Sequence, residues 1–383
     1  MRSDVLERLR AVDPRLLAEI VRQDQRSQSF ELRDWTVERL SSQGIINPDA
    51  LFRFSGHGRA GNEARPWAVV LKILHKPQEE QDRRDLWYWK RELLAGQSQL
   101  LERLPGPVMA PRVYAATEHA DSGWLWMEHI GGNTSQSWTP AHYAFAAREL
   151  GRFNAAYLTG SPLPTDPWLC MDHCRWWLRT LERYHPERAW DNPFVHTAFS
   201  EPVRRNVERL RAEAGRFLTV VNQLPQLFSH FDFQRRNLFI RARADGTDEV
   251  VAVDWAMVGI GPLGGDLVSL IGVSALLFEV EPDKVAELEG VSFDAYRAGL
   301  RDAGWAGDPE LIRLGYTAWL AVWIGATAPT LTAFWTAEGI RDLAKRHFGC
   351  GPEAIAASWA TLCEFALDRA DEARGLMDRL RRG

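Results

Sequence analysis

The chain has 383 residues, of which 45% are hydrophobic and 25% charged, and its formal net charge is -5. This composition is typical of a globular protein with enough apolar material for a sizeable core, and the length indicates roughly two or three domains. The mildly acidic charge argues against a nucleic-acid-binding protein, which usually carries a basic excess or a basic patch.

No secretory signal and no membrane span are expected. The N-terminal sequence lacks a basic segment followed by an apolar one, and the apolar run at residues 317–330 is too short to span and predicts a core helix. The cysteines do not form a disulfide framework, and the spacing of Cys170, His173 and Cys174 is not that of a zinc site. We therefore expect a cytoplasmic protein that does not contact the membrane.

The first part of the chain predicts helices. Residues 3–23 place leucines and isoleucine at helical spacing behind the N-cap candidate Ser3. Residues 35–40 predict a second helix. We assign residues 1–45 to an N-terminal helical segment.

Residues 46–130 predict a small β-rich domain. Alternating and continuous apolar runs indicate strands, and a return to helical spacing indicates one helix between them. The strands are expected at residues 51–54, 67–74, 112–117 and 124–129, and the helix within residues 79–104.

Residues 131–383 predict a larger, mainly helical domain that begins at Gly131 and Gly132. Helices are expected at residues 140–158, 173–183, 200–224 and from about 262 to 380, with short strands at 227–230, 238–241 and 250–254. Strands that come early and helices that come late favour an α+β fold over an alternating parallel sheet.

The residues that carry chemistry are concentrated between His230 and Asp254. Asp232 and Asn237 stand five apart between two apolar runs, and Asp254 ends a third run. Phosphoryl transfer needs a carboxylate that accepts the proton of the attacking hydroxyl. It also needs an amide oxygen and a second carboxylate that hold magnesium against a triphosphate. The alternative is that Asp232 and Asn237 cap a turn and Asp254 caps a strand end.

The stretch from His230 to Asn237 resembles the His-x-Asp-x-x-x-x-Asn loop of the aminoglycoside phosphotransferase family, a small-molecule branch of the protein-kinase-like superfamily. The Asp254-Trp255-Ala256 stretch and residues 261–267 are similar to that family's continuation. The resemblance implies a protein-kinase-like two-lobed fold. It also implies a kinase that uses magnesium and transfers the γ-phosphoryl group of ATP, or GTP, to a hydroxyl of a small molecule.

The resemblance also implies a role for each residue of this stretch. Asp232 would be the catalytic base and His230 would brace the loop. Asn237 and Asp254 would be magnesium ligands, and Asp266 would be a structural anchor or a helix N-cap. Gln234, Arg235 and Arg236 lie inside the loop, where an arginine could neutralise phosphoryl charge or simply face solvent.

Lys72 lies within the apolar run 67–74 and corresponds to the strand lysine that reaches the nucleotide phosphates in such kinases. The resemblance makes Glu92, within the expected helix, its partner; the alternatives are that Glu92 is an ordinary helix-surface residue or that Glu102 is the partner. A snorkelling surface lysine is the alternative, but it fits an apolar strand poorly if both faces of that strand are covered.

Further nucleotide contacts follow from the same resemblance. Gly56, Gly58 and Gly61 fit a glycine-rich loop over the phosphates, although the ten residues before Lys72 leave little room for a regular strand, and a plain turn is the alternative. Glu128 and Ile130 lie at the position of the adenine-binding hinge.

The acceptor is left open by the sequence. An aminoglycoside or another antibiotic, with a role in antibiotic resistance, is one class, and a sugar or choline-like amino alcohol is another. A nucleotide-binding module without catalysis is the remaining alternative. Tryptophans of the helical part wall an acceptor pocket or, more commonly, pack in the core; they are Trp168, Trp176, Trp177, Trp190, Trp319, Trp323 and Trp335. The oligomeric state is not indicated.

Overall fold

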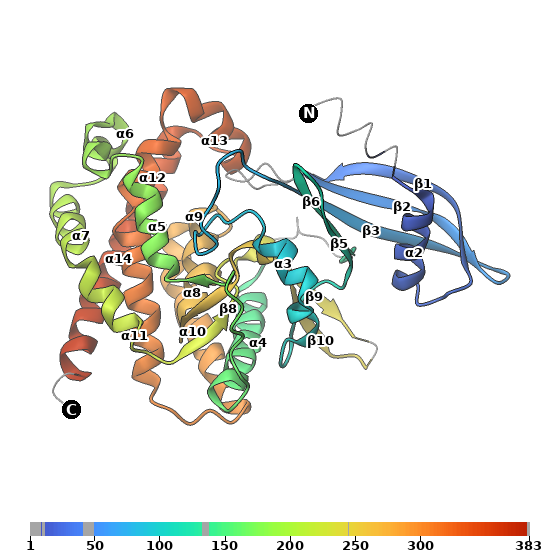
Figure 1. Cartoon of the computed structure of the whole chain (residues 1–383). Helices are drawn as coiled ribbons and strands as arrows, with labels where there is room; N and C mark the ends of the chain where they lie inside the picture. Colours follow the sequence, from blue (N-terminus) through green and yellow to red (C-terminus); the bar gives the residue numbers. More distant parts are fainter. Residues whose placement is uncertain (1–8, 10–11, 41–49, 132–137, 244, 381–383) are drawn as a thin grey trace. The chain divides into compact units, whose positions relative to one another are not determined.

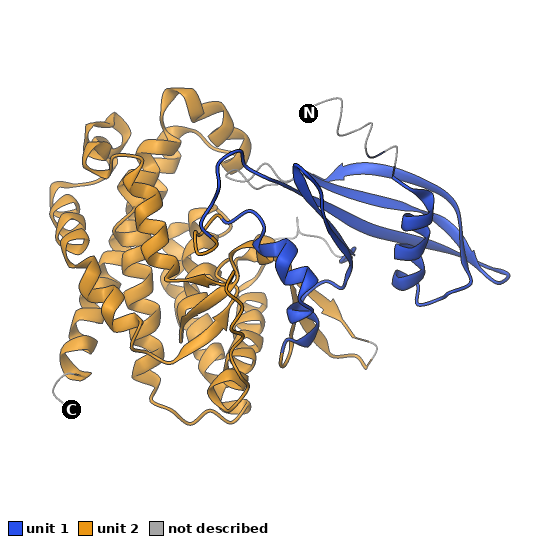
Figure 2. Cartoon of the chain, viewed as in Figure 1, with its two compact units in different colours: residues 1–82, 88–104, 109–132 blue, residues 83–87, 105–108, 133–383 orange. Residues whose placement is uncertain are grey.

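The computed structural model describes residues 9, 12–40, 50–131, 138–243 and 245–380. The chain divides into two compact units, shown in two colours in Figure 2. The first comprises residues 1–82, 88–104 and 109–132, and the second residues 83–87, 105–108 and 133–383. The described part of residues 1–45 belongs to the first unit and forms no unit of its own.

The first unit is built on a five-stranded antiparallel sheet of order β1-β2-β3-β6-β5. Its strands are β1 (Phe30–Leu40), β2 (Ala50–Ala60), β3 (Glu63–His75), β5 (Val113–Glu118) and β6 (Ser122–Glu128). Helix α2 (Pro14–Asp24) lies against one face of this sheet (Figure 1). There Leu17, Ile20 and Val21 join a buried cluster with Phe52 and Trp126, so burial of apolar surface holds the helix to the sheet.

One helix prediction in this unit is wrong, and a second is correct over only part of its predicted range. Residues 35–40 belong to strand β1, because Trp35, Thr36 and Val37 favour extended backbone. The strand is at the exposed edge of the sheet, where polar residues are tolerated on both faces, so apolar and polar residues do not alternate along it. Of residues 79–104, only α3 (Arg91–Gln97) and the 3-10 turn η1 (Leu100–Arg103) are helical. Helix α2 begins after the N-cap Asp13, and Ser3 lies outside the described residues.

Strands β2 and β3 form a tight hairpin. Ala60 pairs with Glu63, and the two residues between them make the turn, with Gly61 at φ +61°. A left-handed residue suits such a two-residue turn, because its twist matches that of the flanking strands. The residues between Gly61 and Lys72 therefore do accommodate a regular strand.

Helices dominate the second unit (Figure 1). They are α4 (Pro140–Leu158), α5 (His173–Glu182), α6 (Pro193–Ala198), α7 (Glu201–Val221), α10 (Val285–Asp302), α11 (Pro309–Leu320), α12 (Ala328–Trp335), α13 (Arg341–Phe348) and α14 (Pro352–Leu380). Helices α4 and α10 meet closely at Gly151 and Gly299, where an added Cβ would lie 2.3 and 2.0 Å from carbonyl oxygens of the other helix.

Shorter elements connect these helices. Two three-stranded sheets have the orders β4-β10-β9 and β7-β11-β8. Their strands are β4 (Val108–Met109), β7 (Cys170–Met171), β8 (Gln226–Ser229), β9 (Leu238–Ala242), β10 (Asp248–Ala252) and β11 (Gly259–Pro262). The short helical segments are η2 (Pro186–Asp191), η3 (Arg235–Asn237), η4 (Trp255–Met257), α8 (Gly265–Val268), η5 (Ser269–Val273), α9 (Ser274–Leu276), η6 (Pro282–Lys284), η7 (Ala321–Gly325) and η8 (Glu338–Ile340). The early strands and the late helices confirm the predicted α+β class.

The most apolar helix is part of the core. The continuous helical run Pro309–Trp335 has 27 residues and is long and apolar enough to cross a membrane, so the prediction that this run is too short is wrong. However, 89% of its most apolar 18-residue stretch is buried inside the protein, which confirms the core assignment. The tryptophans Trp168, Trp177, Trp190, Trp319, Trp323 and Trp335 are each at most 9% exposed, and this favours core packing over pocket walls.

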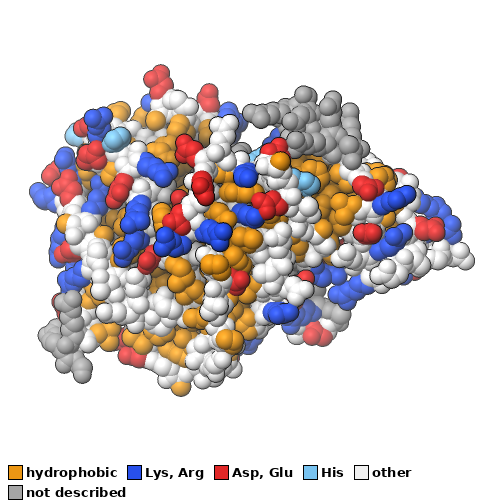
Figure 3. Space-filling view, viewed as in Figure 1, with side chains coloured by type: hydrophobic (Ala, Val, Ile, Leu, Met, Phe, Trp, Pro, Cys, Tyr) orange, Lys and Arg blue, Asp and Glu red, His pale blue; other side chains and the backbone are white. Residues whose placement is uncertain are grey.

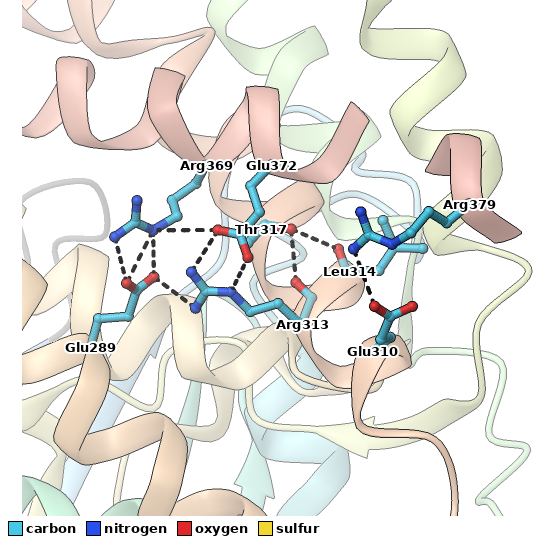
Figure 4. A network of polar contacts seen from close by, with 8 residues as sticks. All are labelled: Glu289, Glu310, Arg313, Leu314, Thr317, Arg369, Glu372 and Arg379. Carbon is cyan, nitrogen blue, oxygen red and sulfur yellow. Dashed lines mark hydrogen bonds and ion pairs between the residues drawn. The ribbon is translucent and has the colours of Figure 1, made fainter. Parts of the chain in front are cut away.

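An ion network around the buried Glu289 ties α14 to α10 and α11 (Figure 4). Glu289 lies 3.1 Å from Arg313 and 2.6 Å from Arg369, and Arg313 bonds Glu372 at 2.5 Å. Such charges are costly to desolvate and are tolerated because each has an opposite partner. On the face seen in Figure 3, acidic and basic side chains are interspersed, in keeping with the small net charge.

Candidate active site

Asp266 of α8 anchors the loop that follows β8. Its carboxylate accepts hydrogen bonds from the backbone N–H groups of His230, at 3.2 Å, and Phe231, at 2.8 Å. Ser269 donates to the Phe231 carbonyl at 2.8 Å. Phe231 has φ +61°, an uncommon conformation for a bulky residue, and these contacts hold it there. The structure thus agrees with the anchor role implied for Asp266.

Burial raises the pKa of Asp266 to about 6, although the bonds from Phe231 and His230 act in the opposite direction. We expect Asp266→Ala to lower the free energy of unfolding by about 2–5 kcal/mol, because two buried N–H groups lose their acceptor. Ser269→Ala is the control and should cost only about 1 kcal/mol. Urea denaturation measures both, and a wild-type midpoint for Asp266→Ala would show that the anchor is dispensable.

The pH dependence of that loss has a defined sign. The folded-state pKa of Asp266 is above its unfolded value of 3.8, so the folded protein binds this proton more tightly. The stability contributed by the group is complete below pH 3.8 and falls as pH rises through about 6. The destabilisation by Asp266→Ala should therefore be larger at low pH than at pH 7.

His230 connects the loop to the next strand. Its Nδ1 atom accepts the N–H of Asp232 at 3.2 Å, and its Nε2 atom lies 3.1 Å from the carbonyl oxygen of Val253. An accepting Nδ1 and a donating Nε2 define a neutral ring with the proton on Nε2. The ring also packs on Trp255, with centroids 4.4 Å apart. This geometry fits the bracing role.

Asp232, Asn237 and Asp254 lie at the same end of the β9–β10 hairpin. The Asn237 side-chain nitrogen donates to the Asp232 carboxylate at 2.7 Å and to the Asp232 carbonyl at 3.0 Å. The Val253 N–H donates to the Asn237 carbonyl at 2.9 Å. The backbone of the following residue, Asp254, therefore lies near Asn237. Asp254 has φ +64°, a left-handed conformation that is uncommon outside functional sites and turns.

This donor set fits magnesium. The Asn237 nitrogen is used by Asp232, so its oxygen would be the ligand end of the amide, and Asp254 would add a carboxylate. Magnesium prefers such oxygen ligands and needs only one or two protein carboxylates beside water and phosphate. In the described residues no group of three or more His, Cys, Asp or Glu could hold a metal, and Cys170 and Cys174 are buried free thiols.

Lys72 and Glu92 form a buried ion pair within the first unit. The Lys72 Nζ atom lies 2.6 Å from a Glu92 carboxylate oxygen, and the side chains are 10% and 4% exposed. This is the predicted pairing of strand β3 with helix α3, and it excludes a snorkelling lysine. Lys72 pairs across the sheet with Leu51 and Leu125, so it shares a face with the small apolar cluster around Val70.

The sheet does not bring the three glycines next to Lys72. Gly56 and Gly58 lie within β2, whereas Lys72 pairs with Leu51 of that strand, about 17 Å from Gly56 at the usual rise per residue. Gly61 is in the hairpin turn, about twice as far. The β1–β2 connection is at the Lys72 end of the sheet, and its residues 41–49 lie outside the described residues.

Packing explains two of these glycines. A Cβ at Gly56 would lie 2.0 Å from the Asp34 carbonyl oxygen, and one at Gly58 would lie 2.2 Å from the Phe30 ring. Both contacts are with β1, whose register shifts between Leu32 and Asp34. The glycines therefore allow β1 to pack closely on β2, which the glycine pattern alone could not distinguish from a phosphate loop.

Glu128 and Ile130 are at the end of β6, as predicted. The Glu128 N–H donates to the Arg112 carbonyl at 2.8 Å, and its carboxylate accepts the Arg112 N–H at 3.2 Å. Ile130 is 8% exposed. Their contact with adenine stays a prediction.

The arginines of the loop turn away from solvent. Arg236 bonds Glu279 at 2.5 Å, and Arg235 lies 3.5 Å from the same carboxylate. Gln234 accepts the Arg236 N–H at 2.8 Å. Glu279 is absent from the predicted site. No neighbouring motif in the sequence identifies Glu279, because its side chain contacts arginines more than forty positions earlier.

Comparisons with known proteins identify one family and several similar solved structures. The Phosphotransferase enzyme family (APH) matches residues 91–306. No curated protein matches the chain. Among solved structures, amicoumacin kinase hAmiN has 14% identity and a TM-score of 0.48, with 93% of this chain and 96% of that chain covered.

Two further solved structures are similar at the same level. Spectinomycin phosphotransferase APH(9)-Ia has 11% identity and a TM-score of 0.49, with 91% and 98% of the two chains covered. Choline kinase from Cryptosporidium parvum Iowa II has 13% identity and a TM-score of 0.49, with 96% of each chain covered.

The family match covers more than half of the chain and includes Glu92, Asp232, Asn237 and Asp254. It confirms the predicted protein-kinase-like fold and the predicted class of enzyme. The chain belongs to the phosphotransferase enzyme family and is a small-molecule kinase.

Proposed function

We propose that this enzyme transfers the γ-phosphoryl group of ATP, or GTP, to a hydroxyl of a small molecule with magnesium as cofactor. The contact between Asn237 and Asp232 at 2.7 Å, beside Asp254, carries this proposal. It presents one carboxylate to an acceptor and two oxygen ligands to a metal, which is the set that phosphoryl transfer requires.

Asp232 orients the acceptor hydroxyl and takes its proton as the hydroxyl oxygen bonds to the γ-phosphorus and the bond from that phosphorus to the leaving nucleoside diphosphate breaks. Neutral His230 holds the Asp232 backbone through its Nδ1 atom, so the carboxylate has a fixed direction. Lys72, oriented by Glu92, supplies a positive charge for the nucleotide phosphates. Asn237 and Asp254 would hold magnesium, which would supply charge neutralisation for the triphosphate.

An aminoglycoside or another antibiotic is the acceptor that we propose, with a choline-like amino alcohol or a sugar as the alternative. Family membership supports a small hydroxylated acceptor, and the fold alone does not select among these classes. The cytoplasm, where ATP and magnesium are abundant, is the proposed location.

Phosphate transfer from labelled ATP to a panel of hydroxylated antibiotics, amino alcohols and sugars tests the proposal. Product formation with one class is the expected result. If the wild type binds ATP with magnesium and transfers phosphate to no panel member, the alternative of a binding module without catalysis is supported.

Asp254→Ala should remove the gain in ATP affinity that magnesium gives the wild type. The reason is that the variant loses the carboxylate ligand and retains only the Asn237 oxygen. Calorimetric titration of ATP with and without magnesium measures the gain. Equal affinities in the wild type under both conditions would contradict the metal assignment.

A further inference from the structure

One continuous segment of the second unit, residues 265–279, holds both ends of the catalytic loop. Its first part carries Asp266 and Ser269, which hold the start of the loop as described above. Its last part contacts the other end. The Ser274 hydroxyl accepts the Arg235 N–H at 3.3 Å, and the Leu277 carbonyl accepts an Arg236 guanidinium N–H at 2.8 Å.

Glu279 completes this second attachment. Its carboxylate bonds the Arg236 Nε atom at 2.5 Å and lies 3.5 Å from the Arg235 Nε atom. The Arg235, Arg236 and Glu279 side chains are 5%, 16% and 21% exposed, so water screens these charges only weakly. A largely buried guanidinium is stable only beside an opposite charge, so Glu279 helps to fix the position of Arg236, which it bonds directly.

The segment itself is fixed at its end. Phe278 has φ +60°, a rare conformation for an aromatic residue. This conformation sets the direction of the backbone immediately before Glu279. The Phe278 ring packs on Phe348 of α13 and Trp359 of α14, with centroids 5.5 and 6.5 Å apart. Trp359 also donates to the Leu276 carbonyl at 3.0 Å. Helices α13 and α14 therefore support the position of Glu279.

We propose that Glu279 is a positioning residue of the phosphotransferase reaction. By holding Arg236 it fixes the following residue, Asn237, whose amide must contact Asp232 and present its oxygen to magnesium. The inference rests on the proposed function for its kinetic consequences. The contact between the segment and the loop can be tested without it.

Glu279→Gln removes the charge and keeps the size of the side chain, and Glu279→Asp keeps the charge. Glu281→Gln, an exposed glutamate two residues later, is the matched control. We expect faster amide hydrogen exchange at residues 234–238 in Glu279→Gln. The magnesium gain in ATP affinity should be smaller in this variant, and phosphate transfer per folded molecule should fall by about 10²-fold. In all three measurements Glu279→Asp should give values between those of Glu279→Gln and the wild type, and Glu281→Gln should match the wild type.

A purely structural role would lower the folded fraction and leave the magnesium gain of the folded enzyme unchanged, which would overturn the proposal. If Glu279→Gln does not fold, the pair variant Arg236→Met/Glu279→Met replaces both charges by apolar groups, which proteins often tolerate. If a folded pair variant shows amide hydrogen exchange and phosphate transfer at wild-type rates, the positioning role of Glu279 is also overturned. If the wild type itself shows no magnesium gain, the proposed function fails, and the exchange data alone decide the contact.

Discussion

Asp232→Asn is expected to lower phosphate transfer by about 10²–10⁴-fold, the usual contribution of a positioned general base. An asparagine keeps the shape of the side chain but cannot take the hydroxyl proton. It also loses the negative charge that orients the acceptor, so the loss should be at the upper end of that range. ATP affinity should barely change, because the nucleotide contacts are assigned to other residues. Calorimetry and product formation with the best panel substrate measure the two effects separately.

The control for this variant is Asp248→Asn, which changes an exposed aspartate on β10 of the same hairpin. It should match the wild type in both measurements. Loss of ATP binding in Asp232→Asn would mean that Asp232 has a structural role through its contact with Asn237. Unchanged transfer would mean that the base is another residue.

The geometry of the loop from His230 to Asn237 could be predicted because it is encoded locally. His230, Asp232 and Asn237 occupy one short stretch, and their mutual bonds are determined by that spacing and the flanking strands. Lys72 and Glu92 could be paired from the sequence for a related reason. An apolar strand that contains a single lysine requires a buried counterion, and the family resemblance favours Glu92 over Glu102 for that place.

Glu279 could not be predicted, because its role depends on tertiary packing. Its position follows from the left-handed Phe278 and from contacts with α13 and α14, some 70 to 80 residues further along the chain. The ion network of Glu289, Arg313 and Arg369 has the same character, since its members come from three separate helices. Charged residues on amphipathic helices carry no local mark that distinguishes such partners from solvent-facing residues.

The mistaken elements have physical reasons of the same kind. Strand β1 is exposed at the edge of the sheet, so its polar residues do not alternate as they do in a half-buried strand. The stretch before α3 has helical spacing, but side chains compete for its backbone: Gln81 accepts the Trp89 N–H at 2.9 Å and Asp85 accepts the Trp87 N–H at 3.1 Å.

Lys72→Met is expected to reduce phosphate transfer by about 10²–10³-fold, the effect of removing one preorganised charge or donor from a phosphoryl site. It should also lower the free energy of unfolding by about 3–5 kcal/mol, because Glu92 would be left buried without its counterion. Product formation and urea denaturation measure the two losses. Lys90→Met is the matched control, since Lys90 pairs with the exposed Glu118, and such pairs are worth about 0–1 kcal/mol.

The pair variant Lys72→Met/Glu92→Met separates the two roles of the lysine. With both charges removed, the apolar surroundings of β3 and α3 should accept the methionines and restore most of the lost stability. Phosphate transfer should stay low, because no cation remains to meet the nucleotide phosphates. If transfer returns together with stability, the ion pair only holds helix α3 against the sheet, and Lys72 has no part in binding the nucleotide.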